Sequence, residues 1–358
     1  MEYIGRNSGC VLLPSFSVMT DHPIVRLLCV AGGSAVCVWW CLKRNTPTPK
    51  QGPLITALGE SDVPRCGCII KLGGSACTKK DSFETFNFDE VSRFSEQLAD
   101  IYASDSEFKP VVVHGAGSFG HFQAKQYSVG AGATSASGAP STGNERISSF
   151  LREGFAKTRL SVTRLNHHII TTLIQKGIPA VGVSPFPIIP ASQRRMASET
   201  ASWPWRRTLI SSLSETLSLG LVPVLHGDAC IDPGSRATSI LSGDTLFVDL
   251  CKVFRPTHAV FLADVEGVLS GPPNSQPYPE LISKILVRAD GSWCSQSITT
   301  SCGPNDVTGG IKLKIQSAVE VVQALRIPVY IVKAGSVDAQ LAMRGIRPTA
   351  GTTVEFQS

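Results

Sequence analysis

The sequence has little charge and no long basic run, which excludes one class of partner. Only 17% of its 358 residues are Asp, Glu, Lys or Arg, and the formal net charge is +5. No run of lysine and arginine is longer than two residues. Nucleic-acid-binding domains carry clustered basic patches. A nucleic-acid partner is therefore not expected, and a small-molecule substrate is favoured.

Two nucleotide-binding signatures are also absent. No segment fits G-x-x-x-x-G-K-[ST], which excludes a P-loop enzyme, and H-R-D with D-F-G is missing, which excludes a protein kinase. The G-x-G-x-x-G spacing does occur, at 115–120, but a dinucleotide site needs an acidic residue about 20 positions further on. Residues 130–143 contain no acid, and Glu145 lies too far along. A dinucleotide site is therefore disfavoured.

The cysteines do not form the pattern of a disulfide scaffold or a zinc site. There are 11, an odd number, at scattered positions. Cys66 and Cys68 form a C-x-C pair, but no second pair lies at zinc-finger spacing. We expect buried free thiols, a reducing and hence cytoplasmic location, and no metal held by the protein's own ligands.

A hydrophobic run of membrane-spanning length is missing as well. The uncharged stretch from Leu27 to Leu42 is shorter than the roughly 20 residues that a spanning helix needs, and Gly32-Gly33 interrupts it. Residues 46–53 (TPTPKQGP) predict an extended linker. We predict that 1–64 is an N-terminal extension, disordered or targeting, and that 65–358 forms one domain. Membrane anchoring or organelle targeting by the extension stays an alternative.

Apolar runs that end in turn residues alternate with helical patterns through the rest of the chain. Buried strands are predicted at 68–72, 111–113, 180–183, 221–225, 258–264 and 328–334. Helices are predicted at 88–102, 147–176, 209–219, within 239–251 and at 305–325, with a flexible loop at 129–143 and an irregular insertion at 184–207. This alternation predicts an α/β fold with a mostly parallel sheet and helices on both faces.

Four glycine-bearing turns follow these strands or open these helices. They are GGS (73–75), HGAGSFGH (114–121), SGD (242–244) and TGG (308–310). Glycine lets backbone N–H groups approach an oxyanion closely, and helix N-termini attract phosphate. Strand carboxyl ends form the ligand crevice of open α/β sheets. One such turn alone is more often a plain tight turn, but four together predict a phosphate site.

Cationic side chains lie in or beside these turns. Lys71 is at the end of a buried strand, where an ammonium group is costly unless it meets an anion. Lys80 lies in the following loop, Lys314 lies one turn into a helix, and His121 can carry a proton near neutral pH. Such groups could stabilise a transferring phosphoryl group, so phosphoryl transfer is predicted. The alternative for each lysine is an ordinary solvated position.

Four aspartates near the turns have open roles. Asp228, Asp244, Asp264 and Asp306 could each hold a nucleotide hydroxyl, orient a lysine or approach Mg²⁺ through water. For Asp228 and Asp244, capping a helix N-terminus is the alternative. The spacing does not choose among these roles.

Six segments together resemble the amino acid kinase superfamily. They are KLGGS (71–75), HGAGSFGH (114–121), HGDACID (226–232), ILSGDTL (240–246), ADVEGV (263–268) and DVTGGIKLK (306–314). The resemblance covers about 66–335. Its GSFGH ending is similar to the isopentenyl phosphate kinase family in its eukaryotic, plant-like form. Relatives that act on acetylglutamate, glutamate, aspartate or UMP lack this histidine.

The resemblance implies an open αβα sandwich, with ATP over the C-terminal half and the phosphorylated substrate over the N-terminal half. It implies transfer from ATP to isopentenyl phosphate in isoprenoid biosynthesis, with ATP and Mg²⁺ as cofactors and a homodimer as the assembly. A kinase of the same fold that acts on another small acceptor is the alternative; that acceptor would be another alkyl phosphate, or an acyl or nucleotide group.

The resemblance also implies the site residues. The implied ATP-binding residues are Lys71, Gly73, Gly74, Ser75, Gly117, Asp264, Gly309, Gly310 and Lys314. The implied acceptor-binding residues are Ala116, Gly120, His121 and Gly227. The catalytic assignments are Lys80, which steadies the transition state, His121 and Lys71. The sequence departs from the family pattern at Ala263, Glu266 and Ile311, where threonine, aspartate and methionine are usual, and 188–207 matches poorly.

The chemistry of the acceptor agrees with these assignments. A phosphate monoester has a second pKa of about 6, so it is already a nucleophile near neutral pH and needs no strong base. The site must instead position two repelling anions and neutralise their charge. The predicted helix at 147–176 could line a five-carbon tail, with an ordinary core role as the alternative.

Overall fold

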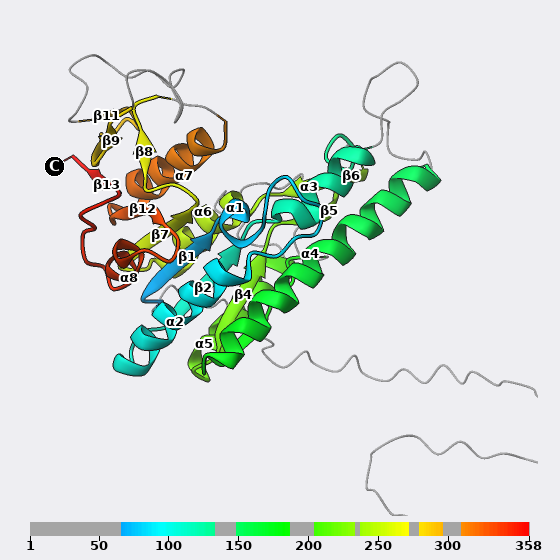
Figure 1. The fold of residues 1–358 in the computed structure, drawn as a ribbon, viewed down its shortest axis with the longest axis horizontal. Helices are drawn as coiled ribbons and strands as arrows, with labels where there is room; N and C mark the ends of the chain where they lie inside the picture. The colour runs from blue at the N-terminus through cyan, green and yellow to red at the C-terminus, as the bar shows by residue number, and fades with distance from the viewer. Residues whose placement is uncertain are drawn as a thin grey trace, which may run out of the picture. The chain divides into compact units, whose positions relative to one another are not determined.

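The computed structural model describes residues 66–132, 148–186, 204–232, 237–271, 279–295 and 309–357 (Figure 1). The predicted N-terminal extension at 1–64 lies outside the described residues. Most of the predicted loop at 129–143 and of the predicted insertion at 184–207 lies outside them too.

The described residues contain a nine-stranded central sheet with strand order β11-β10-β13-β12-β7-β1-β2-β4-β3. Its strands are β1 (Cys68–Leu72), β2 (Pro110–His114), β3 (Ala180–Gly182), β4 (Val222–His226), β7 (His258–Ala263), β10 (Lys284–Val287), β11 (Trp293–Ser295), β12 (Val329–Lys333) and β13 (Thr352–Phe356). Within this sheet, only the β10–β11 and β12–β13 pairings are antiparallel. The mostly parallel sheet that the sequence predicts is confirmed.

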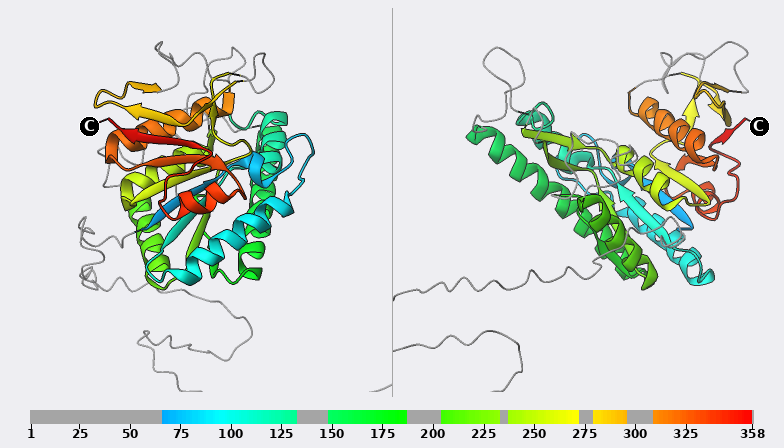
Figure 2. Two further views of the ribbon diagram at one scale, coloured as in Figure 1. Left: turned by 60° about the vertical axis from the view of Figure 1, so that its left-hand side comes forward. Right: turned by 180° about the vertical axis from the view of Figure 1, so that it is seen from behind.

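Helices cover both faces of this sheet, as predicted (Figure 2). They are α1 (Gly74–Cys77), α2 (Phe88–Ser104), α3 (Gly117–Gln126), α4 (Ser149–Gln175), α5 (Pro204–Ser218), α6 (Gly243–Phe254), α7 (Gly309–Leu325) and α8 (Val337–Met343). Neighbouring residues of a strand point to opposite faces. Ile70 of β1 therefore belongs to the core cluster that includes α2, α4 and α8, while Ile69 belongs to the cluster that includes α5, α6 and α7.

The strands that the sequence pattern misses lie outside the contiguous run β12-β7-β1-β2-β4-β3 of the central sheet. A hairpin of β5 (Asp228–Asp232) and β6 (Ala237–Leu241) includes the first residues of the 239–251 segment, and the helix predicted within that segment begins after it, at Gly243. A smaller pair, β8 (Val268–Leu269) and β9 (Leu281–Ile282), and strands β10, β11 and β13 were not predicted either. These strands lack the continuously buried run that marks β1, β2, β4 and β7, so no apolar stretch identifies them in the sequence.

Two helix predictions need correction. Helix α5 begins at Pro204, inside the predicted irregular insertion, because proline is well suited to the first position of a helix. The 3.6-residue periodicity of 147–176 also predicts Phe150 on the apolar face of this long helix, yet 52% of the residue is exposed. Its ring lies against that of Tyr127, with the centroids 4.7 Å apart, instead of in the main core.

None of the described helices is both long and apolar enough to cross a membrane. The uncharged stretch from Leu27 to Leu42 lies outside the described residues.

Candidate active site

A cavity of about 910 Å³ lies where the carboxyl ends of β1, β2, β4 and β7 meet. Most of the site residues predicted from the sequence line it: Lys71, Gly73, Gly74, Ser75, Lys80, Ala116, Gly117, Gly120, His121, Gly227, Asp264 and Lys314. Gly309 and Gly310 are the first residues of α7, the helix that carries Lys314 to the cavity. Asp306 lies outside the described residues.

The glycine turns at 73–75 and 114–121 pack against each other. This close packing requires glycine there, independently of any contact with phosphate. A Cβ on Gly74 would lie 2.7 Å from the backbone nitrogen of Gly117, and a Cβ on Gly115 would lie 2.6 Å from that of Gly74. Gly117 also has a φ of +50°, which disfavours any side chain. The loop after β1 and the loop after β2 therefore meet backbone to backbone at the cavity.

Lys71 is buried and paired. Its Nζ lies 2.8 Å from Oδ1 of Asp244, in the first turn of α6, and only 5% of the lysine side chain is exposed. Burial alone would raise the pKa of Asp244, but the charge and hydrogen bond of Lys71, aided by Lys314, hold it below its usual value. Asp244 thus orients a lysine. The capping alternative is wrong for it, because Ser242 is the N-cap and accepts from the Thr245 N–H.

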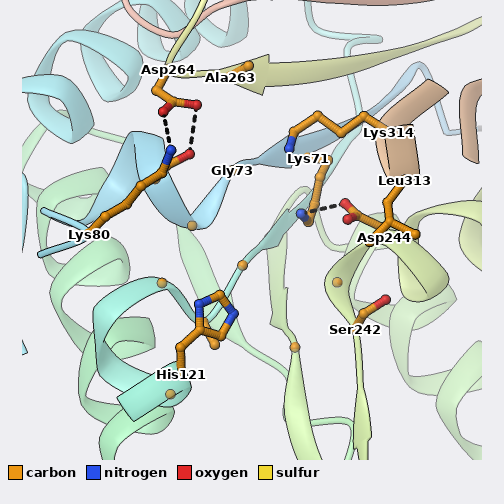
Figure 3. A pocket seen from close by; sticks show the side chains of 18 of the residues that line it. Lys71, Gly73, Lys80, His121, Ser242, Asp244, Ala263, Asp264, Leu313 and Lys314 are labelled. Carbon is orange, nitrogen blue, oxygen red and sulfur yellow. Dashed lines mark hydrogen bonds and ion pairs between the residues drawn. The ribbon is translucent and has the colours of Figure 1, made fainter. Parts of the chain in front are cut away.

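Lys80 makes a second lysine–aspartate pair, at the open side of the cavity. Its Nζ lies 2.6 Å from Oδ2 of Asp264, and the Ser75 hydroxyl donates to Oδ1 at 2.8 Å (Figure 3). The Lys80 side chain is 62% exposed, so water screens this pair far more than the Lys71 pair. Burial would raise the pKa of Asp264, but the hydrogen bonds from Lys80 and Ser75 hold it low.

Lys314 faces the same cavity from α7 (Figure 3). Burial lowers the pKa of Lys314, and Lys71 and Lys80 add to that effect while Asp244 and Asp264 oppose it. A polyanion bound between these lysines would favour their charged forms. The ligand that the electrostatics of this part of the cavity suit best is therefore a polyphosphate.

His121 lines the cavity from α3, apart from the two lysine–aspartate pairs (Figure 3). Burial and then the nearby charge of Lys71 lower the pKa of its imidazole, which favours the neutral ring in the free protein. An anion beside the ring would shift the pKa upward and favour a charged hydrogen-bond donor. His121 can therefore respond to a bound phosphate.

Part of the cavity wall is apolar, although Lys125, Thr158 and Asp228 also line the cavity. Val162 of α4 lines it together with Ala124 of α3 and Ile240 and Leu241 of β6. The long helix thus contributes to the cavity as well as to the core, whereas the contribution of β6 was missed along with its hairpin. The apolar wall suits a short hydrocarbon group attached to a phosphate.

Asp228 also lines the cavity, with a fully buried side chain, and it forms an ion pair with an arginine that the sequence did not point to. Its Oδ2 lies 3.5 Å from Nη2 of Arg159, and its Oδ1 accepts from the Ala229 N–H at 2.8 Å. Burial raises the pKa of Asp228 to about 7, although Arg159 opposes the shift. The capping alternative is wrong for Asp228, which begins β5. No local pattern distinguishes Arg159 from the exposed basic residues of the same helix.

Among the described residues, no group of three or more His, Cys, Asp or Glu side chains could hold a metal ion. Asp244 and Asp264, the carboxylates nearest the lysines, are already paired. Magnesium is commonly held by one or two carboxylates together with substrate phosphates and water. This donor set suits an ion that enters with a nucleotide better than one bound by the protein alone.

Comparisons with known proteins point to one family. The model of the amino acid kinase family matches residues 67–333. The isopentenyl phosphate kinase of Arabidopsis thaliana is 34% identical over 332 residues, which cover 80% of this chain and 93% of that protein. The isopentenyl phosphate kinase of Methanothermobacter thermautotrophicus is 33% identical, with coverage of 69% and 84%.

Solved structures agree with these relatives. A structure described as isopentenyl phosphate kinase superimposes with a TM-score of 0.60 at 28% identity, and covers 80% of this chain and 99% of that one. The product complex of the Thermoplasma acidophilum isopentenyl phosphate kinase has a TM-score of 0.58 at 21% identity over 81% of this chain and all of that one, which supports the fold alone.

Proposed function

The chain belongs to the amino acid kinase family, and from this premise we propose that it transfers the γ-phosphoryl group of ATP to isopentenyl phosphate. The products are ADP and isopentenyl diphosphate, a building block of isoprenoids. The observation that carries the proposal is the cavity itself, which places three lysines and His121 around one space beside an apolar wall. Relatives named for this activity cover most of the chain.

The reaction is a direct displacement between two phosphates. A non-bridging oxygen of the acceptor attacks the γ-phosphorus of ATP, and the bond from that phosphorus to the β–γ bridging oxygen breaks. ADP carries the released electron pair. The acceptor oxygen is already unprotonated for much of the time at neutral pH, so no general base is required. Catalysis then depends on alignment and on neutralising charge.

The cations of the cavity supply that neutralisation in our proposal. Lys71 and Lys314 bind the phosphates of ATP, together with the backbone N–H groups of Gly74 and of Gly309-Gly310 at the start of α7. The Gly73 N–H donates to the Leu262 carbonyl, so Gly73 contributes close approach and not a donor. Lys80 steadies the charge on the transferring group. Lys80 is exposed, and its ion pair with Asp264 is screened by water, so it can exchange Asp264 for a phosphate oxygen at little cost. Asp264 and Ser75 remain on the nucleotide side.

The acceptor phosphate is proposed to lie at Ala116, Gly120, His121 and Gly227, with its hydrocarbon tail along Val162 and Ile240. His121 donates a hydrogen bond to this phosphate. A histidine that becomes charged beside an anion suits an acceptor that carries a phosphate. An amino acid carboxylate or a hydroxyl acceptor would not require it.

Magnesium is proposed to enter with ATP, because the described residues offer no metal cage. When bound, it supplies further positive charge at the phosphates. Asp244 and Asp264 are the cavity carboxylates that pair with the lysines, and either could reach the ion, directly or through water. We also propose a homodimer and a cytoplasmic location, which gel filtration and fractionation can check.

An acceptor panel tests the proposed function. The full chain is incubated with ATP, Mg²⁺ and one acceptor at a time, and ADP release is followed by a coupled assay. We expect isopentenyl phosphate to be preferred in kcat/KM over acetylglutamate and UMP. Equal or better turnover of either of these two would assign the chain to another acceptor.

A further inference from the structure

Two buried histidines adjoin the proposed acceptor site without lining the cavity. His114 ends β2 and His226 ends β4, and the two residues are direct partners in the register of these parallel strands. Their rings stack with centroids 5.5 Å apart, and at most 1% of either residue is exposed. Each histidine is followed by a glycine that lines the cavity, Gly115 or Gly227.

Each ring is hydrogen-bonded to the carbonyl oxygen of the glycine that follows the histidine in the chain. Nδ1 of His114 lies 2.9 Å from the Gly115 oxygen, and Nδ1 of His226 lies 3.1 Å from the Gly227 oxygen. A carbonyl oxygen can only accept a hydrogen bond, so Nδ1 carries the proton in both rings. Both rings are therefore placed to hold a backbone carbonyl at the end of a strand.

Asn166 of α4 fixes the same protonation state at His114 independently. Its amide nitrogen lies 3.4 Å from the Val224 carbonyl oxygen, which identifies it as the donor, and 3.1 Å from Nε2 of His114. Nε2 must then accept, which leaves the proton on Nδ1. Burial, with the charges of His226 and Lys71, lowers the pKa of His114 to about 3, so the ring stays neutral.

The hydrogen bond to Gly115 determines where the next N–H group points. A peptide unit is planar and trans, so the Gly115 carbonyl and the Ala116 N–H point in opposite directions. The carbonyl is directed to the buried ring, and the N–H is therefore directed away from it. No hydrogen bond between described residues uses the Ala116 N–H as donor, and Ala116 lines the cavity. This leaves one oriented donor for an anion.

We propose that His114 is a positioning residue for the acceptor phosphate. Its Nδ1–H holds the Gly115 carbonyl so that the Ala116 N–H stays available to the phosphate, and His226 supports the ring by stacking against it. Without this hydrogen bond, the Gly115 carbonyl would keep only the weak 3.9 Å contact with the Cys77 thiol, and the peptide next to this glycine would be held less firmly. The inference rests on the proposed function, because the anion at Ala116 is taken to be the acceptor phosphate.

A pair of variants of similar shape tests the role of the hydrogen bond. His114→Asn keeps an N–H donor bonded to Cγ, as Nδ1 is in histidine, whereas His114→Leu has the same branching at Cγ without a donor. We expect His114→Leu to raise the KM for isopentenyl phosphate about tenfold, as for one lost oriented hydrogen bond, while the KM for ATP changes less than twofold. His114→Asn should return the acceptor KM to within about threefold of the wild-type value.

A purely structural role predicts a different pattern. The two variants would then raise both KM values alike, in step with a loss of thermal stability, and the proposal would be overturned. Unchanged acceptor KM in a folded His114→Leu protein would also overturn it. If the wild type shows no ADP release that depends on isopentenyl phosphate, the proposed function itself has failed. That outcome differs from failure of the His114 proposal, in which the wild type is active.

The wild-type protein provides a test that does not depend on how the variants fold. Nitrogen-15 NMR of labelled histidine should show His114 protonated at Nδ1 and unprotonated at Nε2. Isopentenyl phosphate should move the Ala116 amide proton downfield, as expected on bonding to a phosphate oxygen. A proton on Nε2 of His114, or an Ala116 amide that does not respond to the acceptor, would contradict the proposal.

Discussion

The cavity contains two lysine–aspartate pairs of nearly equal length that should differ greatly in what they contribute to stability. Lys71–Asp244 is 2.8 Å long and Lys80–Asp264 is 2.6 Å long. The lysine side chain is 5% exposed in the first pair and 62% exposed in the second. Removing one partner of a buried pair leaves an uncompensated buried charge and costs about 3–5 kcal/mol. An exposed pair is worth about 0.2–1 kcal/mol.

The same substitution can be made in both pairs. We expect Asp244→Asn to lower the free energy of unfolding by about 3–5 kcal/mol and Asp264→Asn by less than about 1 kcal/mol. Urea denaturation of the ligand-free proteins at pH 7 measures both values, provided that the m-value is unchanged. The pH matters, because the pKa of Asp244 is held below its usual value. The contribution of ionised Asp244 to the free energy of unfolding is fully present above about pH 4, and it is lost as acidification passes the lowered pKa.

A double variant separates the buried charge from other effects of the substitution. Lys71→Met combined with Asp244→Asn leaves no unpaired ammonium, so it should be less destabilised than the sum of the two single variants. Equal losses for Asp244→Asn and Asp264→Asn, or strict additivity in the double variant, would refute the reasoning from burial.

Three further predictions concern the site. His121→Ala should reduce kcat/KM for the acceptor through lost phosphate binding, by a factor that corresponds to about 2–4 kcal/mol. A kcat/KM within twofold of the wild-type value would show that His121 does not contact the acceptor. Lys80→Ala should lower kcat more than it raises the KM for ATP; an unchanged kcat would contradict its proposed role. His114 and His226 have pKa values lowered to about 3 and about 4, so the unfolded chain binds protons below about pH 6.5 that the folded protein does not. Stability should therefore fall with acidification from about pH 6.5 to 4, and His114→Leu should reduce this slope by about 1.4 kcal/mol per pH unit in urea titrations; an unchanged slope would show that His114 titrates normally.

The features that local sequence determines were predictable. Apolar runs such as 68–72 and 258–264 end in turn residues, and the structure has strands β1 and β7 there. The cost of burying an ammonium group also predicts that Lys71 needs an anion, and the structure supplies Asp244. The identity of that partner was not predictable, because Asp244 lies far along the chain and only the packing of α6 against β1 brings it near.

Other parts of the site depend on pairing between distant segments. The hairpin of β5 and β6 forms one wall of the cavity, but its short strands pair with each other outside the main sheet and leave no clear pattern. Arg159 is bound to Asp228 only because α4 lies against β5. The two buried histidines likewise become partners only once β2 and β4 are adjacent. Each of these features follows from tertiary contacts that no single segment encodes.

Phosphorus-31 NMR of the reaction mixture tests the central claim most directly. With the full chain, ATP, Mg²⁺ and isopentenyl phosphate, the monoester signal of the acceptor should decline while two coupled diphosphate signals of the product grow in step with ADP. An unchanged acceptor signal, or ATP consumption that yields only inorganic phosphate, would contradict the account.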